Sequence, residues 1–378
     1  MPRILLLNHY QPPDPAPTGR LLGELATALR SRGWEVELVS GSVANYRSST
    51  EGKRGKLLGW IRAHALLMLR GLKAGPCDVV LCLTDPPFLL LTARVVATFH
   101  RAKFVHWVMD LYPDLAVELD EFPRSLGAIL GQAMKSTYRS CDAIVGLDGA
   151  MADRLRPHVS MPPVVVPPWV QQSLDPLLQA GYEIRRPANN SDRLGWLYSG
   201  NLGRSHEFEP LLRIQAELES RGVPATLVFQ GRGAAIPMAQ DFAEELGVVH
   251  CEFRDYAPED QFVSSLLEAD LLVATLRKEL GGMLWPSKLA LMRKLDRPIL
   301  WIGPRGDLAD EMESRNPASL GILPEQWAVA PDWISSLSKQ NQTLSGPGIQ
   351  LDSITNEREK SQSSLCELLA GLLPLGPR

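Results

Sequence analysis

Short apolar runs alternate with helix-capable segments along this chain, and the whole alternation occurs twice. The runs of the first half are ILLLN, WEVELVS, CDVVLCLTD, KFVHWVMD and CDAIVGLD. After Pro168 the pattern restarts with GWLYSG, ATLVFQG, VVHCEF, ADLLVATL and PILWIG. Runs of this length, separated by helices, are typical of buried parallel strands joined by crossover connections. The sequence therefore predicts an α/β protein.

The two halves predict two Rossmann-like, doubly wound domains in tandem that face a shared cleft, because ligands bind at the carboxyl ends of the strands in such sheets. We expect an N-terminal domain over 1–170, a second domain over 171–335, and a polar linker with a C-terminal helix over 336–378. Gln171–Asp192 is a candidate hinge. The Ser-, Gln- and Asn-rich stretch 335–364 is typical of a mobile loop.

Composition excludes several other classes of protein. Hydrophobic residues make up 45% and charged residues 22% of the chain, as in ordinary globular proteins rather than disordered or collagen-like ones. The five cysteines are widely spaced, which predicts neither a disulfide framework nor a zinc ribbon and favours a reducing, cytoplasmic compartment. No apolar run approaches the roughly 18 residues of a membrane span, and the first residues lack the apolar region of a signal peptide.

The sequence also predicts no metal ion and no separate cofactor. Its seven histidines lack ligand spacing such as H-E-x-x-H. It contains neither an Asp-x-Asp pair nor a Walker A loop. We therefore expect a site built from side chains and backbone groups alone.

One stretch of the first half combines positive charge with apolar surface. Between Arg47 and Lys73, basic residues oppose the single acid Glu51, with leucine, isoleucine and tryptophan among them. A basic amphipathic helix of this kind can lie in the headgroup layer of an anionic membrane. The expected membrane contacts are Lys53, Arg54, Lys56, Trp60 and Arg62. The alternative is a helix that packs on its own sheet, and nucleic acid is disfavoured because the chain as a whole is acidic.

Three loops have features that suit a phosphorylated ligand. Thr18 and Gly19 precede a helix, whose first N–H groups and dipole attract anions. In the second half, Gly200 to Arg204 follow a strand, and a guanidinium fork matches phosphate oxygens. Pro286, Ser287 and Lys288 open another helix and add an ammonium group. These loops predict a diphosphate cradle, and the alternatives are a stiff surface loop, a plain turn and a capped helix.

Two polar residues lie where a strand of the first half ends. His106 and Asp110 stand at the end of KFVHWVMD, and Asp85 has the same position after VVLCLT. Asp110 could accept a proton or bind a hydroxyl group of a substrate. The alternative is that Asp110 caps the next segment and His106 is a hydrogen-bonded core residue.

Several of these segments, in this order, resemble family 4 glycosyltransferases of the GT-B fold, especially bacterial enzymes that build surface polysaccharides and lipid-linked oligosaccharides. The matching motifs are RLLGELA, HWVMDLYPD, SGNLGR, FQGRGA, EADLLVATL and WPSKLALMRKLDRPIL. The last is similar to the P-S-K-L-x-x-x-x-A-x-G-x-P pattern of that group, and the resemblance covers most of the chain. It implies a retaining, metal-independent sugar transfer from a UDP- or GDP-linked donor to a lipid-linked or polysaccharide acceptor at the inner face of the cell membrane.

The same resemblance implies roles for individual residues. Those that would hold the donor diphosphate are Gly19, Gly200, Asn201, Arg204, Ser287 and Lys288. Those that would contact the base, ribose or sugar are Gly231, Arg232, Phe253, Arg254, Tyr256, Glu279, Gly281, Gly282, Met283 and Leu289. His106 and Asp110 would be the catalytic residues, facing the transferred sugar or the acceptor.

The chain departs from the family pattern at three positions. Many members have two glutamates where this chain has Met283 and Leu291, and a glycine where it has Asp296. Glu279 or backbone groups near Gly281 would then replace the missing contacts. Two alternatives to a transferase therefore stay open: a sugar-nucleotide epimerase on the same scaffold and a non-catalytic partner subunit.

Overall fold

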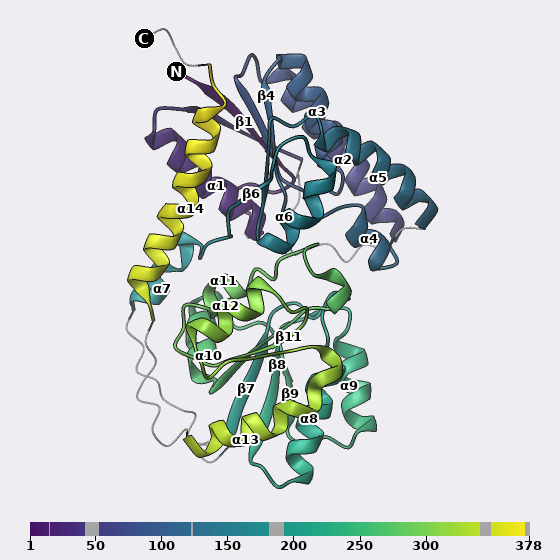
Figure 1. The fold of residues 1–378 in the computed structure, drawn as a ribbon, viewed down its shortest axis with the longest axis vertical. Coiled ribbons are helices and arrows are strands. Elements are labelled where there is room, and N and C mark those ends of the chain that lie inside the picture. The colour runs from purple at the N-terminus through teal and green to yellow at the C-terminus, as the bar shows by residue number, and fades with distance from the viewer. Residues whose placement is uncertain (15, 42–52, 122–123, 181–192, 341–348, 375–378) are drawn as a thin grey trace. The chain divides into compact units, whose positions relative to one another are not determined.

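The computed structural model describes the whole chain except residues 15, 42–52, 122–123, 181–192, 341–348 and 375–378 (Figure 1). The chain divides into two compact units. Unit 1 consists of Met1–Gln172, Gly282–Trp285 and Asn356–Arg378, and unit 2 consists of Ser173–Gly281 and Pro286–Thr355. Each unit contains one six-stranded sheet whose strands all run parallel. The predicted α/β fold class is therefore confirmed.

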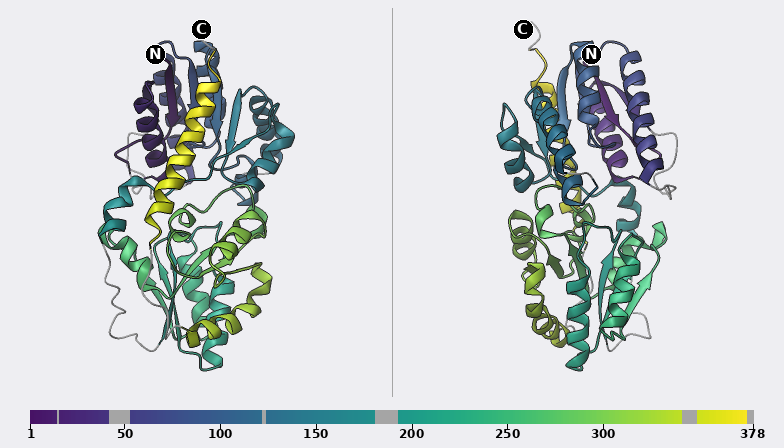
Figure 2. Two further views of the ribbon diagram at one scale, coloured as in Figure 1. Left: turned by 60° about the vertical axis from the view of Figure 1, so that its left-hand side comes forward. Right: turned by 90° about the vertical axis from the view of Figure 1, so that its right-hand side faces the viewer.

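The sheet of unit 1 has the strand order β2-β1-β3-β4-β5-β6. Its strands are β1 (Arg3–Asn8), β2 (Glu35–Ser40), β3 (Val79–Cys82), β4 (Lys103–Trp107), β5 (Ala143–Gly146) and β6 (Val164–Val165). Its helices are α1 (Pro17–Ser31), α2 (Lys53–Lys73), α3 (Leu89–His100), α4 (Asp114–Glu118), α5 (Arg124–Tyr138) and α6 (Gly149–Leu155), with the short turn η2 (Arg156–His158). Helices lie on both faces of the sheet (Figure 2), so the central strand residues Ile4–Leu7 are fully buried. This double cover explains why the strands read as continuous apolar runs.

The sheet of unit 2 has the order β12-β11-β10-β7-β8-β9, which reverses direction between β10 and β7. Its strands are β7 (Leu194–Ser199), β8 (Ala225–Gln230), β9 (Cys251–Arg254), β10 (Leu271–Thr275), β11 (Ile299–Ile302) and β12 (Leu320–Ile322). Its helices are α7 (Asp175–Gln179), α8 (Glu209–Ser220), α9 (Ile236–Glu245), α10 (Phe262–Glu268), α11 (Leu289–Met292), α12 (Asp307–Arg315) and α13 (Ala330–Gln340), with short turns η3 (Gln172–Leu174), η4 (Glu259–Gln261), η5 (Lys278–Leu280) and η6 (Pro324–Val329). Trp196, Tyr198 and Phe229 fill the centre of its core. Ligands of such doubly wound sheets bind where the strand order reverses.

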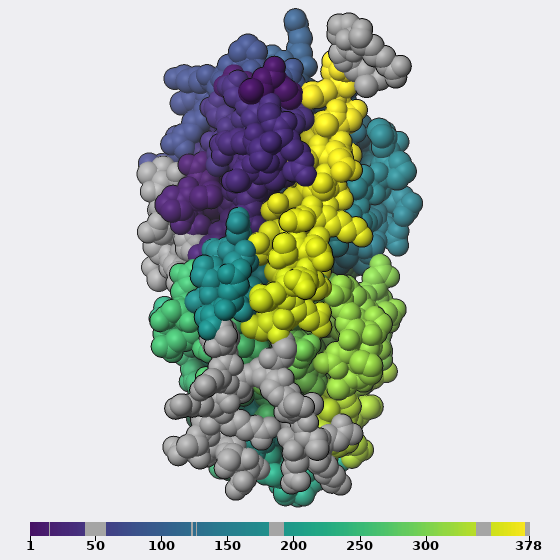
Figure 3. Space-filling view, turned by 90° about the vertical axis from the view of Figure 1, so that its left-hand side faces the viewer, coloured from purple at the N-terminus to yellow at the C-terminus, as the bar shows by residue number. Residues whose placement is uncertain are grey.

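The C-terminal region differs from the predicted polar linker. Helix α13 ends at Gln340. A second helix, α14 (Leu351–Gly371), begins after ten intervening residues and belongs to unit 1 from Asn356 onward. Figure 3 shows α14 in yellow along the N-terminal part of that unit. Its polar residues have partners there: the buried Arg358 Nε donates to the Val170 carbonyl at 3.0 Å, and Arg32 donates to Ser363 Oγ at 2.9 Å. Composition alone predicts a loop because these distant partners are not visible in it.

Two other expected segments also differ from the structure or lie partly outside it. The helix expected after Pro286 is only four residues long, since α11 ends at Met292. Of the candidate hinge Gln171–Asp192, the structure describes η3 and α7, and residues 181–192 lie outside the described part.

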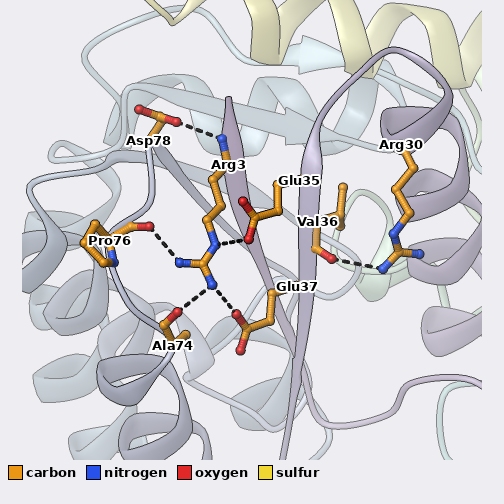
Figure 4. A network of polar contacts seen from close by, with 8 residues as sticks. All are labelled: Arg3, Arg30, Glu35, Val36, Glu37, Ala74, Pro76 and Asp78. Atoms are coloured by element: carbon orange, nitrogen blue, oxygen red, sulfur yellow. Dashed lines mark hydrogen bonds and ion pairs between the residues drawn. The ribbon is translucent and has the colours of Figure 1, made fainter. Parts of the chain in front are cut away.

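A network of polar contacts holds the edge strand β2 (Figure 4). Arg3 on β1 forms ion pairs with Glu35 and Glu37 at 2.9 and 2.7 Å. The same guanidinium donates to the carbonyls of Ala74 and Pro76 at the end of α2. Because one side chain is shared by β1, β2 and the loop before β3, the strand register at this edge is fixed.

Candidate functional site

Three glycines shape the loops at the carboxyl ends of β7 and β8. Gly200, Gly231 and Gly233 have φ angles of +136°, +145° and +150°. A Cβ atom on Gly231 would lie 2.1 Å from the Gly200 carbonyl oxygen, and one on Gly233 would lie 2.2 Å from the Leu202 carbonyl oxygen. The loops are tied by a hydrogen bond of 2.9 Å from Gly200 N to the Gln230 carbonyl. Only glycine permits this approach of two backbones.

Lys288 brings a buried ammonium group to this pair of loops. Its Nζ lies 3.6 Å above the centre of the Tyr198 ring, and a Cβ on Gly200 would lie 3.4 Å from the same atom. Among the residues that the structure describes, none accepts a hydrogen bond from Nζ. Burial lowers the pKa of Lys288 to about 7. A buried cation without a hydrogen-bonding partner destabilises the fold. An anion that binds beside it gains strong, charge-assisted hydrogen bonds.

The other residues predicted for the diphosphate lie in unit 2, with one exception. Asn201, Arg204 and Ser287 are exposed, Asn201 and Arg204 on the loop after β7 and Ser287 beside Lys288. The Asn201 carbonyl accepts a hydrogen bond of 3.0 Å from the Tyr198 hydroxyl. Gly19 is the exception: it lies in the first turn of α1 in unit 1, where a Cβ would come within 3.1 Å of the Tyr10 backbone.

Two residues beside Lys288, one at the end of β7 and one in the loop after it, were not predicted from the sequence. Tyr198 supplies the aromatic face under Lys288, and its ring lies 5.8 Å from that of His206. His206 Nδ1 lies 2.7 Å from the Thr275 carbonyl, so it fixes the loop to the end of β10. Burial and the nearby Lys288 lower the pKa of His206 to about 3, which keeps the ring neutral. No motif spacing marks either residue, because both act through contacts that the fold creates.

The residues predicted for the nucleoside line the ends of β8 and β9. Phe253 stacks on Phe229 with a ring separation of 5.0 Å, and Tyr256 is 44% exposed. Arg232 forms an ion pair with Asp255, and Arg254 forms one with Glu252. The exposed Tyr256 ring, beside Gly231, is the aromatic surface of this group that a base could contact.

The remaining predicted sugar and ribose contacts are divided between the two units. In unit 2, Glu279 lies 3.8 Å from Arg277 and Leu289 is fully buried. Gly281 also belongs to unit 2, whereas Gly282 and Met283 belong to unit 1. There the Met283 carbonyl accepts a hydrogen bond of 2.7 Å from Leu111 N.

Gly282 is a position where the backbone requires glycine. Its φ is +71°, and a Cβ would lie 2.7 Å from the Ala150 carbonyl oxygen. The next residues form an isolated antiparallel bridge between Leu284 and Asp110. The segment therefore lies against the loop that carries Asp110 within unit 1.

Asp110 is a partly buried carboxyl group next to a second one. Its backbone N–H donates to Thr84 Oγ1 at 3.3 Å, and Asp85, the residue after Thr84, accepts a hydrogen bond of 3.2 Å from Thr18 Oγ1. Burial, and then the charge of Asp85, raise the pKa of Asp110 to about 7. A carboxyl group that titrates near neutral pH suits proton transfer.

His106 has a different environment from Asp110. Its ring is 1% exposed, and Nδ1 lies 3.1 Å from the Cys82 carbonyl oxygen and 3.3 Å from Cys82 Sγ. Burial lowers the pKa of His106 to about 4. The structure therefore places a neutral imidazole inside the core of unit 1, between β3 and the Tyr138 ring, rather than beside Asp110 in the loop.

The predicted membrane residues lie on α2. The side chains of Lys53, Arg54 and Lys56 lie outside the described part of the structure. Trp60 is half-buried and Arg62 is exposed. Leu58, Ile61 and Leu69 of the same helix are exposed by 67%, 58% and 50%. Large apolar side chains thus lie in solvent beside basic ones.

Within the described residues, no group of three or more His, Cys, Asp or Glu side chains is arranged to hold a metal ion. A helix long and apolar enough to cross a membrane is absent from the same part of the chain.

Comparisons with known proteins agree with this architecture. Residues 18–173 match the model of Glycosyltransferase Family 4. A curated relative, the probable glycosyltransferase WbjE of Pseudomonas aeruginosa, is 23% identical over 234 residues, which are 61% of this chain and 58% of that protein. The matched part thus spans little more than half the length of that relative.

Solved structures share the fold over nearly the full chain. The lipopolysaccharide outer core galactosyltransferase WaaB has a TM-score of 0.58 at 13% identity, covering 99% of this chain and all of that one. HepE of Anabaena in complex with UDP has a TM-score of 0.59 at 12% identity, covering 98% and 100%. These likenesses identify the GT-B fold. The match to Glycosyltransferase Family 4 covers residues 18–173, which lie almost wholly within unit 1.

Proposed function

We propose that the protein transfers a sugar from a nucleotide-sugar donor to a lipid-linked or polysaccharide acceptor, with retention at the anomeric carbon and without a required metal. The observation that carries the proposal is the buried Lys288 ammonium group. It lies beside the loop of Gly200, and none of the described residues accepts a hydrogen bond from it. The family match over residues 18–173 supports sugar transfer. The UDP complex of HepE supports a UDP-linked donor over a GDP-linked one.

The chemistry of unit 2 follows from the charge of the leaving group. When the bond from sugar to diphosphate breaks, negative charge grows on the departing phosphate oxygens. A cation that is already in place and shielded from water stabilises this charge without reorganisation. Lys288 provides the fixed charge, and the exposed Arg204 can add a planar fork of donors. These two cations would take the part that a divalent ion has in metal-dependent sugar transfer.

Unit 1 would hold the acceptor. Asp110, with its pKa raised to about 7, can accept a proton from an acceptor hydroxyl at neutral pH. His106 would support this loop from inside the core, because its ring bonds to Cys82 at the end of β3. Glu279 and backbone groups at Gly281 would replace the contacts that the resemblance expects from two glutamates.

The proposal predicts selective nucleotide binding. A nucleotide at about 100 times its dissociation constant should stabilise the fold by about 2.7 kcal/mol. We expect UDP and its sugar conjugates to raise the melting temperature in a thermal-shift screen that also contains GDP, ADP and CMP. No shift with any nucleotide would contradict the donor site.

The same screen, followed by product analysis, separates the alternatives. Sugar transfer to an added lipid-linked or glycan acceptor supports the transferase. Conversion of the nucleotide sugar to an epimer without an acceptor would indicate the epimerase, which the family match does not favour. Binding of the donor without turnover on any acceptor would indicate a non-catalytic partner subunit.

We further propose that unit 1 binds the inner face of an anionic cell membrane through α2, which would bring the enzyme to a lipid-linked acceptor. Leu58 and Ile61 are more than half exposed and precede the exposed Arg62 on the same helix. Apolar side chains that enter the headgroup layer and cations that meet anionic lipids add to each other in such a helix. Exposed groups of this kind are unfavourable in water, which favours a partner surface.

The membrane proposal predicts that substitutions confined to α2 weaken the binding of the protein to vesicles. Replacing Leu58 and Ile61 by serine removes two insertable side chains, each worth about 1.5–3 kcal/mol when buried. We expect the double variant to partition at least about tenfold less onto vesicles of phosphatidylglycerol and phosphatidylcholine in a sedimentation assay. Val249→Ser, at a site of unit 2 that is 75% exposed, is the control and should bind as the wild type does. Equal binding of all three proteins would remove α2 from the membrane contact.

A further inference from the structure

The connections between the strands of unit 1 place three of its helices on one face of the sheet. In the order β2-β1-β3-β4-β5-β6, the chain moves in one direction from β2 to β3, from β3 to β4 and from β4 to β5, and in the opposite direction from β1 to β2. Because such connections are right-handed, α2, α3 and α5 lie on one face of the sheet and α1 lies on the other. Helix α3 contacts both α2 and α5 (Figure 1). The three helices therefore form one layer, which we call the α2–α3–α5 layer.

Polar side chains tie the helices of this layer to one another. His64 Nδ1 of α2 lies 2.7 Å from Thr92 Oγ1 of α3. Arg94 of α3 donates to Thr137 Oγ1 of α5 at 3.4 Å. The layer is thus held together as a unit, and the side chains on its outer surface keep their positions relative to one another.

The sequences of the three helices contain basic residues and no acidic ones. No Asp or Glu occurs in α2, α3 or α5, although the chain as a whole has a net charge of -4. The other helices that the structure describes in unit 1, α1, α4, α6 and α14, each contain an aspartate or a glutamate. The basic residues of the layer are Lys53, Arg54, Lys56, Arg62, Arg70 and Lys73 in α2, Arg94 in α3, and Arg124 and Lys135 in α5. Among the described side chains, neither Arg62, Lys73 nor Lys135 forms an ion pair with an acid, so their charge is available to a partner outside the chain.

Large apolar side chains are exposed on all three helices and not only on α2. On α3, Phe99 is 64% exposed and Val95 is 48% exposed. These two residues are four positions apart, so they lie on the same side of that helix. On α5, Ile129 is 69% exposed. Apolar surface thus continues from α2 across the layer, and exposed apolar groups among polar ones mark a surface that binds a partner.

This combination of charge and apolar surface favours a lipid bilayer over other partners. A second copy of the chain would bring two positively charged faces together, and these repel each other. A nucleic acid would attract the cations, but it is bound mainly through phosphates and base edges rather than through inserted aliphatic side chains. An anionic bilayer attracts the cations to its headgroups and takes up the apolar side chains beneath them. The 21 residues of α2 make about 30 Å of helix, and neighbouring helices lie about 8–10 Å apart, so the layer has the dimensions of a flat contact.

We infer that the whole α2–α3–α5 layer, and not α2 alone, is the surface through which unit 1 lies on an anionic bilayer, with Phe99 of α3 and Ile129 of α5 inserted beside the apolar side chains of α2. This inference deepens the membrane contact proposed above for α2 and does not rest on the transfer of a sugar. The layer covers one face of the sheet, so the sheet lies parallel to the bilayer. The carboxyl ends of its strands, where ligands of such sheets bind, then face along the membrane surface rather than away from it.

Vesicle binding by variants outside α2 tests the layer. Replacing both Phe99 and Ile129 by serine removes one insertable side chain from α3 and one from α5. We expect this double variant to partition at least about tenfold less than the wild type onto vesicles of phosphatidylglycerol and phosphatidylcholine, because each apolar side chain that enters a membrane adds to binding. It should unfold at the wild-type temperature, since both side chains are exposed. The matched control replaces Met238 and Val249 of unit 2 by serine; these are 60% and 75% exposed, and the control should bind as the wild type does.

A second variant tests the charge of the layer. Arg124→Glu together with Lys135→Glu places two acids on α5. This variant should bind the same vesicles about tenfold or more weakly than the wild type, because each basic residue near an anionic membrane contributes to binding. Vesicles of phosphatidylcholine alone should bind the wild type much more weakly than the anionic ones. Equal binding to both kinds of vesicle would overturn the charge complementarity on which the inference stands.

The outcomes separate this inference from the earlier proposals. If the serine variant of Phe99 and Ile129 binds like the wild type while that of Leu58 and Ile61 does not, the contact is limited to α2 and the layer is overturned. A loss of binding on charge reversal alone would show a contact without inserted side chains, as with a soluble polyanion such as nucleic acid, and would overturn the layer as well. A wild-type protein that does not bind anionic vesicles would overturn both membrane statements. The nucleotide screen and the product analysis would still decide whether the protein transfers a sugar.

Discussion

A Lys288→Met variant should bind UDP about 100-fold more weakly than the wild type and should also unfold at a higher temperature. The loss of affinity follows because charge-assisted hydrogen bonds to a diphosphate are worth about 1.5–3 kcal/mol each. The gain in stability follows because methionine keeps most of the length of the side chain but removes a buried charge whose Nζ has no acceptor among the described residues. Isothermal titration with UDP and thermal unfolding at pH 6 measure the two effects on one protein.

The matched control is Lys278→Met, which removes an exposed lysine of the same unit. The Lys278 ammonium pairs with Glu325 at 2.9 Å, and both side chains are about half exposed. This variant should change UDP affinity and melting temperature little, since exposed ion pairs contribute about 0–1 kcal/mol. A Lys288→Met protein that binds UDP like the wild type would exclude Lys288 from the donor site. One that is less stable would show that the ring of Tyr198 compensates fully for the buried charge.

The same residue makes donor binding depend on pH in a defined direction. Burial lowers the pKa of Lys288 to about 7 in the free protein, whereas an unfolded chain titrates lysine near 10.4. The diphosphate binds the protonated form, so UDP affinity should fall by about tenfold per pH unit above pH 7. The unfolded state holds the extra proton between these two pH values, so stability should rise with pH there. The advantage of Lys288→Met in melting temperature should therefore be greatest at or below pH 7 and shrink above it.

The sequence predicted the fold more completely than the site. The fold follows from patterns that are local in the sequence, whereas the site depends on contacts between residues far apart in it. The alternation of strands and helices is local, and it located ten of the strands. The strands β6 and β12 were missed because they are only two and three residues long. Helix α14 was missed in part because its polar residues are held by distant partners such as Val170.

Within the site, charged residues in loops were easier to predict than residues that act through neighbours. Lys288 and Arg204 follow recognisable glycine and proline signals, and the structure places both in unit 2. The sequence placed Asp85 after a strand, but it did not predict that Asp85 lies near Asp110, because this depends on β3 and β4 being neighbours in the sheet. The sequence grouped His106 with Asp110 at the end of one apolar run, yet His106 lies within β4 and its side chain points into the core. The direction of a side chain at a strand end depends on register, which spacing alone does not give.

Gly231→Ala should destabilise the protein by about 3 kcal/mol or more and weaken UDP binding with it. A Cβ at this position would lie 2.1 Å from the Gly200 carbonyl oxygen and 2.8 Å from its carbon. Both atoms are backbone, so relief requires the β7 loop to move away from the β8 loop. That movement would displace Gly200, whose own Cβ position is 3.4 Å from Lys288 Nζ. Urea unfolding measures the stability loss, and titration with UDP measures the effect on the site.

The control separates backbone strain from steric contact. Gly222 and Gly247 also have positive φ angles, +67° and +68°, but a Cβ on either would meet nothing within 4 Å. Alanine at either position should lower the stability by about 1–2 kcal/mol, because it is strained in a left-handed backbone. It should leave the affinity for UDP unchanged. If Gly231→Ala lowered the stability no more than these two variants do, the loops after β7 and β8 could move apart easily. The cradle around Lys288 would then form only when the diphosphate binds. If it loses both stability and affinity, the close packing of two backbones is what holds the cation in place before the donor arrives.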